Sequence, residues 1–382
     1  MAVSIQLQNG FIVGGTPDAR VTPNFRLREY LDANGGVRVH RELAAAVQIL
    51  RERLGAAITI IATSGAVPTV ADPGLALRVS AKEMEPLARE AAKLQQQGYF
   101  ERVEPEDAQL YLQLPDPATL PSIAPALAFD CGVRVTAAFE TSGDPFQQVT
   151  GNFDGAGLSF GPIQCNLKSG TLQELFRRMR GEDPERLARC FDDPEHYAAF
   201  WKLLDGSRSA AVRWADQLST GRGKQGFAQP WKGYLQRVGS EPLFQRCMRS
   251  YAYDKYGKLL MATLAFTASL SPVRITNLRC LAALYDMGVQ QGSLHKAHRQ
   301  IIRRVASEQP ADQFALTRIL VEERAKKAAK RWRADCLSRR LSILEREPVS
   351  VSLDGERSRR GNPKVYLLRD CSVRGLESYL AG

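Results

Sequence analysis

The sequence predicts a two-domain α+β protein, with a small α+β domain followed by a mainly α-helical domain that carries a small β-hairpin. At roughly 100–200 residues per domain, 382 residues are enough for two domains. Four prolines lie within residues 115–125, which is typical of a linker. The charge changes there, because residues 1–118 hold 12 basic and 14 acidic residues whereas the remainder holds 40 and 27. We therefore expect domains over 1–118 and 119–382.

The first domain mixes helices and strands. Apolar residues recur at helical spacing over 39–55, so a helix is expected there. The β-branched residues of 58–63 predict a short strand. Ser80 and Glu83 have the spacing of a capping box and predict the start of a second helix. Residues 108–115 alternate as a further strand.

The second domain is predicted to be mostly helical. A helix is expected over 126–140, followed by a Gly-rich segment, 150–166, that suits turns and a small hairpin. Thr171 and Glu174 form a second capping-box pattern and predict a helix that ends at Gly181. Further helices are expected over 195–218, 240–270, 273–291 and 312–344. In the last of these, apolar residues at helical spacing, Trp332 among them, predict an apolar stripe.

Composition and charge limit the class of protein. A chain with 44% hydrophobic and 24% charged residues is typical of soluble globular proteins. No apolar run approaches the ~20 residues of a membrane span, and the N-terminus has no secretory signal, so we expect synthesis in the cytoplasm. The net charge of +11 comes from the second domain and predicts an anionic partner there: nucleic acid, anionic lipid or bacterial cell wall.

The sequence predicts neither a metal nor a cofactor. The seven cysteines are widely spaced, odd in number and never form CxxC, so we expect buried free thiols instead of a zinc site or a full disulfide framework. His295 and His298 are three residues apart, but no acidic or cysteine partner is placed beside them.

Two carboxylates carry the candidate chemistry. Glu140 ends the predicted helix 126–140, and Asp154 follows in the Gly-rich turn. Glycosidic cleavage needs one protonated carboxyl, which donates to the leaving oxygen, and one ionised carboxylate. Phe139 places Glu140 for apolar contacts that favour the protonated form, and the glycine amides around Asp154 favour the ionised form. Alternatively, Glu140 caps a helix and Asp154 occupies an ordinary turn.

The segments ETSG (140–143), NFDGAGLSFGPIQCN (152–166), SGTLQ (169–173) and LYDMGVQQG (284–292) resemble the lysozyme-like hydrolases related to family 46 chitosanases. That group includes peptidoglycan-degrading domains of secretion effectors and phage lysins. The resemblance implies a lysozyme-like second domain with Glu140 as general acid and Asp154 as its partner. The substrate-binding residues that it implies are Ser159, Gln164, Asn166, Thr171, Asp286 and Gln290. For Asp286, Gln164 and Asn166, a structural hydrogen bond is the alternative.

The first domain is similar to D-Ala-D-Ala carboxypeptidase-like peptidases, in the segments NFRLREY (24–30) and ITIIATSG (58–65) and in the 108–114 strand. Those enzymes hold zinc through His and Asp. Here Arg78 and Tyr111 stand where the resemblance leads us to expect ligands, and His40 is the domain's one histidine. Because a catalytic zinc site needs at least three protein ligands, we expect a degenerate, metal-free domain. It binds wall peptide, docks onto a delivery partner or stabilises the fold.

These observations predict a peptidoglycan glycan-strand hydrolase, with chitosan as the alternative substrate. A catalytically inactive wall-binding module is a second alternative, and nucleic-acid binding through the basic runs 324–333 and 357–360 a third. No known nucleic-acid motif accompanies those runs. The expected partners are peptidoglycan, a delivery apparatus and a cognate inhibitor or immunity protein. The expected site of action is the periplasm or cell wall of a target cell.

Overall fold

The computed structural model describes residues 5–32, 34–62, 73–117, 120–139 and 143–376. The chain divides into two compact units. The first comprises Met1–Ala128, Thr276–Arg279 and Pro363–Tyr379, and the second comprises Phe129–Ile275, Cys280–Asn362 and Leu380–Gly382. The first unit thus extends beyond the predicted boundary at 118. Backbone hydrogen bonds explain this, because the N–H of Ile123 donates to the carbonyl of Ser372 (3.0 Å) and that of Val373 to the carbonyl of Thr276 (2.8 Å).

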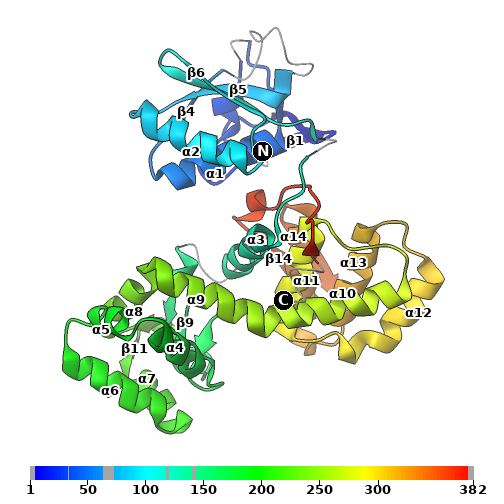
Figure 1. The fold of residues 1–382 in the computed structure, drawn as a ribbon. Coiled ribbons are helices and arrows are strands. Elements are labelled where there is room, and N and C mark those ends of the chain that lie inside the picture. The colour runs from blue at the N-terminus through cyan, green and yellow to red at the C-terminus, as the bar shows by residue number, and fades with distance from the viewer. Residues whose placement is uncertain (1–4, 33, 63–72, 118–119, 140–142, 377–382) are drawn as a thin grey trace. The chain divides into compact units, whose positions relative to one another are not determined.

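Unit 1 contains two antiparallel sheets and two main helices (Figure 1). The first sheet has the order β1-β2-β3, and the second has the order β4-β5-β7-β6. The two helices and the two strands predicted in this domain are present. The elements are β1 (Ile5–Gln8), β2 (Phe11–Gly15), β3 (Val39–His40), α1 (Arg41–Leu54), β4 (Thr59–Ala62), β5 (Ala76–Ser80), α2 (Met84–Gln96), β6 (Arg102–Glu106) and β7 (Gln109–Gln113).

The capping box predicted at Ser80 is wrong. Ser80 ends strand β5, where it pairs with Thr59, so its backbone is already committed to the sheet. Helix α2 begins only at Met84, with Glu83 as N-cap and no side-chain hydrogen bond to the cap.

The first half of unit 2 packs helices around a small sheet of order β10-β9-β8 (Figure 1). Its core is rich in aromatic side chains, with Phe160, Phe176 and Phe200 fully buried. The predicted hairpin over 150–166 is confirmed as part of this sheet. The elements are α3 (Pro125–Ala137), β8 (Val149–Thr150), β9 (Ser159–Phe160), β10 (Cys165–Asn166), α4 (Thr171–Glu182), α5 (Pro184–Arg189), α6 (Pro194–Asp205), α7 (Arg208–Leu218), β11 (Ser219–Thr220), β12 (Gly226–Phe227), α8 (Trp231–Ser240) and α9 (Pro242–Ala252).

The second half of unit 2 is a set of helices followed by a hairpin. The predicted helix 312–344 is wrong as a single element, because the chain leaves the α-helix after Ala325 and re-enters it at Arg333. The elements are α10 (Lys258–Leu270), α11 (Leu278–Gln291), α12 (His298–Glu308), α13 (Gln313–Ala325), α14 (Arg333–Glu345), β13 (Val349–Leu353) and β14 (Glu356–Arg360). The α+β class is confirmed.

All seven cysteines are buried thiols, as predicted. Burial raises the pKa of the Cys165 thiol to about 12 and that of Cys190 to about 11, so both thiols stay protonated near neutral pH. Among the helices that the structure describes, none is long and apolar enough to cross a bilayer.

Candidate active site

A pocket of about 590 Å³ in unit 2 brings together two of the predicted site residues, Asp154 and Gln290. It is built by the Gly-rich loop, the end of α11, the turn before α12, the end of α13, the connection that follows it, the start of α14 and strand β14. Its lining residues are Asp154, Gln290, Gln291, Lys296, Arg324, Lys327, Ala328, Trp332, Asp335, Cys336 and Arg360.

Asp154 lies at the tip of a loop that is fixed at its base by Asn152. The side-chain amide of Asn152 donates to Asp216 of α7 (2.6 Å), and its Oδ1 accepts from the N–H of Gly157 (2.8 Å). Gly151 is required here, because a Cβ would lie 2.3 Å from the carbonyl oxygen of Gly226. The exposed Asp154 accepts only the N–H of Ala156 (3.0 Å) among the described residues, so one carboxylate oxygen remains for water or a ligand.

Trp332 is the aromatic residue of the pocket, and the sequence analysis did not identify it as a site residue. Its side chain is 52% exposed, so the expectation that it belongs to a buried apolar stripe is wrong. The reason is the break between α13 and α14, which takes Trp332 out of the helical register on which that stripe depended. The Arg331 guanidinium lies 5.2 Å from the centroid of its ring. The exposed part of the indole suits stacking against the apolar face of a sugar ring.

The pocket wall carries more positive than negative side chains. Arg324 is 5% exposed, and its Nε donates to the carbonyl of Ser293 (2.9 Å). Burial, and to a smaller extent the charge of Arg340, lower the pKa of Arg324. Lys296 and Lys327 are exposed. On another wall, Arg360 pairs with Asp335 at 3.2 Å.

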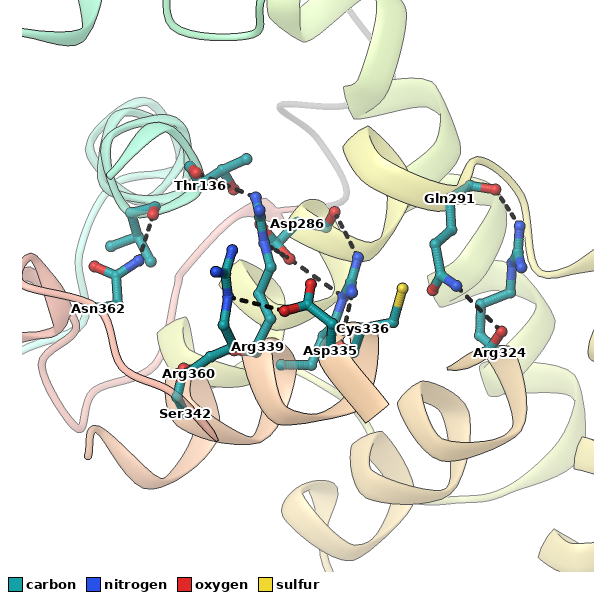
Figure 2. A network of polar contacts seen from close by, with 12 residues as sticks. Thr136, Asp286, Gln291, Arg324, Asp335, Cys336, Arg339, Ser342, Arg360 and Asn362 are labelled. Carbon is teal, nitrogen blue, oxygen red and sulfur yellow. Dashed lines mark hydrogen bonds and ion pairs between the residues drawn. The ribbon is translucent and has the colours of Figure 1, made fainter. Parts of the chain in front are cut away.

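Asp286 does not line the pocket, because it is fully buried between Arg339 and Arg340 of α14. Figure 2 shows it beside Arg339. Arg339 donates to Asp286 from Nη2 (2.8 Å) and Nε (3.0 Å), and Arg340 Nε lies 3.2 Å from the same carboxylate. Arg339 also donates to the carbonyl of Thr136 on α3 (3.2 Å). The cluster therefore ties α3, α11 and α14 together beside the pocket, which is the structural alternative named for Asp286.

The other predicted substrate contacts support the small sheet and its turns. Ser159 is buried in β9. Gln164 accepts from the Thr150 hydroxyl (3.3 Å) and donates to the carbonyl of Gly161 (3.0 Å). The Thr171 hydroxyl accepts from the N–H of Asn166 (2.8 Å) and so closes the turn before α4. None of the four is a lining residue of the described pocket.

Glu140 lies outside the described residues. The preceding Phe139 is described, and its ring centroid lies 4.2 Å from the Arg339 guanidinium and 5.8 Å from that of Arg360. Glu140 as general acid therefore stays a prediction.

In unit 1, Arg78 and Tyr111 lie directly opposite each other on β5 and β7. The guanidinium of Arg78 pairs with Glu106 at 2.6 Å and lies 5.7 Å from the centroid of the Tyr111 ring. Over the described parts of both units, no group of three or more His, Cys, Asp or Glu side chains is placed to hold a metal ion.

Comparisons with known proteins give solved structures but no sequence match. No protein-family model matches the chain, and neither does any curated protein. Two chitosanase structures from Bacillus subtilis MY002, a mutant complexed with 6 GlcN and the native protein, are 11% and 12% identical, each with a TM-score of 0.42. A GH46 chitosanase of Gynuella sunshinyii complexed with chitotetraose is 15% identical, with a TM-score of 0.38. Each alignment covers 62% of this chain and 98–99% of the chitosanase. Similarity at this level does not place the chain in the chitosanase family.

Proposed function

We propose that unit 2 hydrolyses the glycosidic bonds of a glycan strand bound in this pocket, and that the strand is peptidoglycan. The observation that carries the proposal is that an accessible carboxylate, Asp154, lines one pocket with an exposed indole, Trp332, and a side-chain amide, Gln290. Sugar sites combine an aromatic face with a few polar groups that fix orientation. A carboxylate in such a site can act on the bond between two sugars.

In this mechanism, Glu140 donates a proton to the leaving oxygen while Asp154 activates water or stabilises the oxocarbenium-like centre. The pocket then orients the strand, with Trp332 against a ring face and Gln290 within reach of its hydroxyl and amide groups. Both carboxylate assignments follow from the family resemblance. The free oxygen of Asp154 supports the second assignment.

The charge of the pocket favours peptidoglycan over chitosan. Chitosan carries an ammonium group on its sugars, whereas peptidoglycan carries carboxylates. Lys296, Arg324 and Lys327 line the pocket and repel a polycation, so binding of chitosan would cost electrostatic free energy. A delivery apparatus and a cognate inhibitor protein stay predictions from the sequence.

The test is digestion of purified peptidoglycan by the wild-type chain and by Glu140→Gln and Asp154→Asn, with the fragments identified by mass spectrometry. We expect reducing-end muropeptides from the wild type and a rate lower by about 10²–10⁴-fold for Glu140→Gln, because general acid catalysis contributes that much. Asp205→Asn is the matched control, since Asp205 is an exposed carboxylate on α6 that does not line the pocket.

Other outcomes would point to another general acid or to another function. Equal release by wild type and Glu140→Gln would mean that another group is the acid. Retention on the wall without release by any variant would identify a binding module. Faster cleavage of chitosan than of peptidoglycan would identify a chitosanase.

A further inference from the structure

We propose that Arg324, Lys296 and Lys327 form a subsite that binds a carboxylate of the glycan substrate. This rests on the proposed function for the location of the strand and adds the chemical group that the pocket selects. The three cations line the same pocket as Asp154 and Trp332.

Arg324 is the buried member of the subsite, and the described chain gives it no carboxylate. Its Nε and Nη2 donate to the backbone carbonyls of Ser293 and Gln291, and its Nη1 has no acceptor among the described residues. A guanidinium that is 5% exposed loses most of its hydration, and carbonyl oxygens compensate only part of that loss. An anionic ligand would supply the missing charge through a hydrogen bond to Nη1.

The neighbouring carboxylates are already engaged elsewhere. Glu323, one residue before Arg324, pairs with Lys326 at 2.6 Å and with Arg304 at 3.0 Å. Asp335 pairs with Arg360. Glu323 and Asp335 are therefore neutralised by other cations. Asp154, the other carboxylate of the pocket wall, forms no ion pair with Arg324 among the described residues, and the charge of Arg324 is left for a ligand.

Lys296 and Lys327 extend the subsite to the surface. Both are exposed, and neither forms an ion pair with any residue that the structure describes. They approach the pocket from two elements, the turn before α12 and the turn after α13. Converging ammonium groups would attract an anion during encounter and hold it more weakly than Arg324 does.

Gln291 adds an independent sign of a polar ligand. Its Oε1 is buried without a hydrogen-bond partner in the described chain, although its Nε2 donates to the carbonyl of Arg324 (3.4 Å). Figure 2 shows Gln291 and Arg324 facing each other across this part of the wall. A buried acceptor without a donor is unfavourable, and a turn of the Gln291 side chain toward the pocket would let an amide N–H or hydroxyl of a bound sugar satisfy it. The ligand class is thus a glycan with a carboxylate on or beside the sugar.

The carboxylate can have two sources in peptidoglycan. In strands that carry stem peptides, it belongs to the peptide. In peptide-free strands, it belongs to the lactyl group of the sugar. Both present the same group to Arg324 and Lys327, so the experiment includes both ligands.

The test measures binding by titration calorimetry to the full chain carrying Glu140→Gln, which prevents turnover. The ligands are peptide-free glycan oligosaccharides with free lactyl carboxylates, stem-peptide muropeptides, and the neutral chitin hexamer. We expect at least one carboxylate-bearing ligand to bind more tightly than the chitin hexamer. Adding Lys296→Glu and Lys327→Glu should lower the affinity ratio of that ligand to chitin by about tenfold, because each reversal replaces an attraction with a repulsion. The ligand that shows the effect identifies the source.

Lys202→Glu is the matched control, since Lys202 is an exposed lysine on α6 outside the pocket. An affinity ratio that is unchanged in the double variant, or changed equally by Lys202→Glu, would overturn the subsite. Absence of binding by every glycan would overturn it as well. Because binding is read without turnover, charge-dependent binding with no hydrolysis would contradict only the proposed activity, and hydrolysis without charge dependence would contradict only the subsite.

Discussion

The buried arginines of unit 2 differ in how the chain neutralises their charge. Arg339 and Arg340 of α14 enclose the fully buried Asp286. Arg324, on the packed neighbour α13, is buried almost as deeply but receives only backbone carbonyls. A buried cation that is paired internally holds helices together, whereas one left without a carboxylate is available to an anion from outside. A buried arginine that pairs with a carboxylate of the chain is therefore structural, whereas one without such a carboxylate is a candidate binding group.

The largest expected effect comes from removing the internal carboxylate. Asp286→Ala leaves Arg339 and Arg340 buried without a counter-charge, and we expect the free energy of unfolding to fall by about 3–5 kcal/mol. Urea denaturation of the full chain measures it. Asp205→Asn removes a carboxylate from an ion pair on the surface and should change stability by less than about 1 kcal/mol. Similar losses for the two variants would mean that Asp286 does not hold the cluster together.

A smaller effect, on binding alone, is expected at the pocket. Trp332→Ala removes the exposed indole, and we expect glycan affinity to fall by about 5–20-fold, since aromatic contacts of this kind contribute about 1–2 kcal/mol. Stability should change little, because the side chain is half exposed. Calorimetry with the chitin hexamer measures the affinity. Ile302→Ala, which truncates an exposed apolar side chain on α12, is the control. Unchanged affinity in Trp332→Ala would exclude stacking.

The sequence predicted the elements whose periodicity is strong and missed features that depend on distant contacts. Residues 39–55 and 108–115 have clear helical and alternating patterns, and both elements are present. The capping box at Thr171 failed for a tertiary reason. The Thr171 hydroxyl closes the preceding turn, and the Glu174 carboxylate accepts from the Tyr251 hydroxyl 77 positions away. Local spacing cannot indicate such partners.

Only part of the site was predicted, because the rest also depends on features that local spacing does not indicate. Asp154 carried a local signal, a carboxylate among glycines, and it lines the pocket with Gln290. Trp332 carried a misleading one, because residues 326–331 contain Ala, Lys and Arg, which favour continuous helix, and no Gly or Pro to end it. The break there exposes Trp332 and brings Lys327 to the pocket wall. Apolar periodicity cannot predict a helix interruption that no Gly or Pro marks.

The smallest expected effect concerns Arg304, which, unlike Arg324, is already paired with carboxylates of the chain. Arg304 of α12 pairs with Glu308, Glu322 and Glu323. Burial raises the pKa of Glu323, but the hydrogen bonds from Lys326 and Arg304 outweigh it and lower the pKa overall. A lowered pKa in the folded state gives stability that is present above the unfolded pKa of about 4.3 and is lost as the pH falls through the folded pKa.

Glu323→Gln should therefore reduce the free energy of unfolding by about 1 kcal/mol at pH 7, and the difference from wild type should shrink as the pH is lowered from 5 toward about 3. Urea denaturation at both ends of that range measures it, with Glu356→Gln on the exposed face of β14 as the control. A difference that stayed constant over the whole range would show that the ionised carboxylate contributes nothing there. Helices α12 and α13 would then be held by packing alone, and neutralisation by carboxylates would no longer separate Arg304 from Arg324.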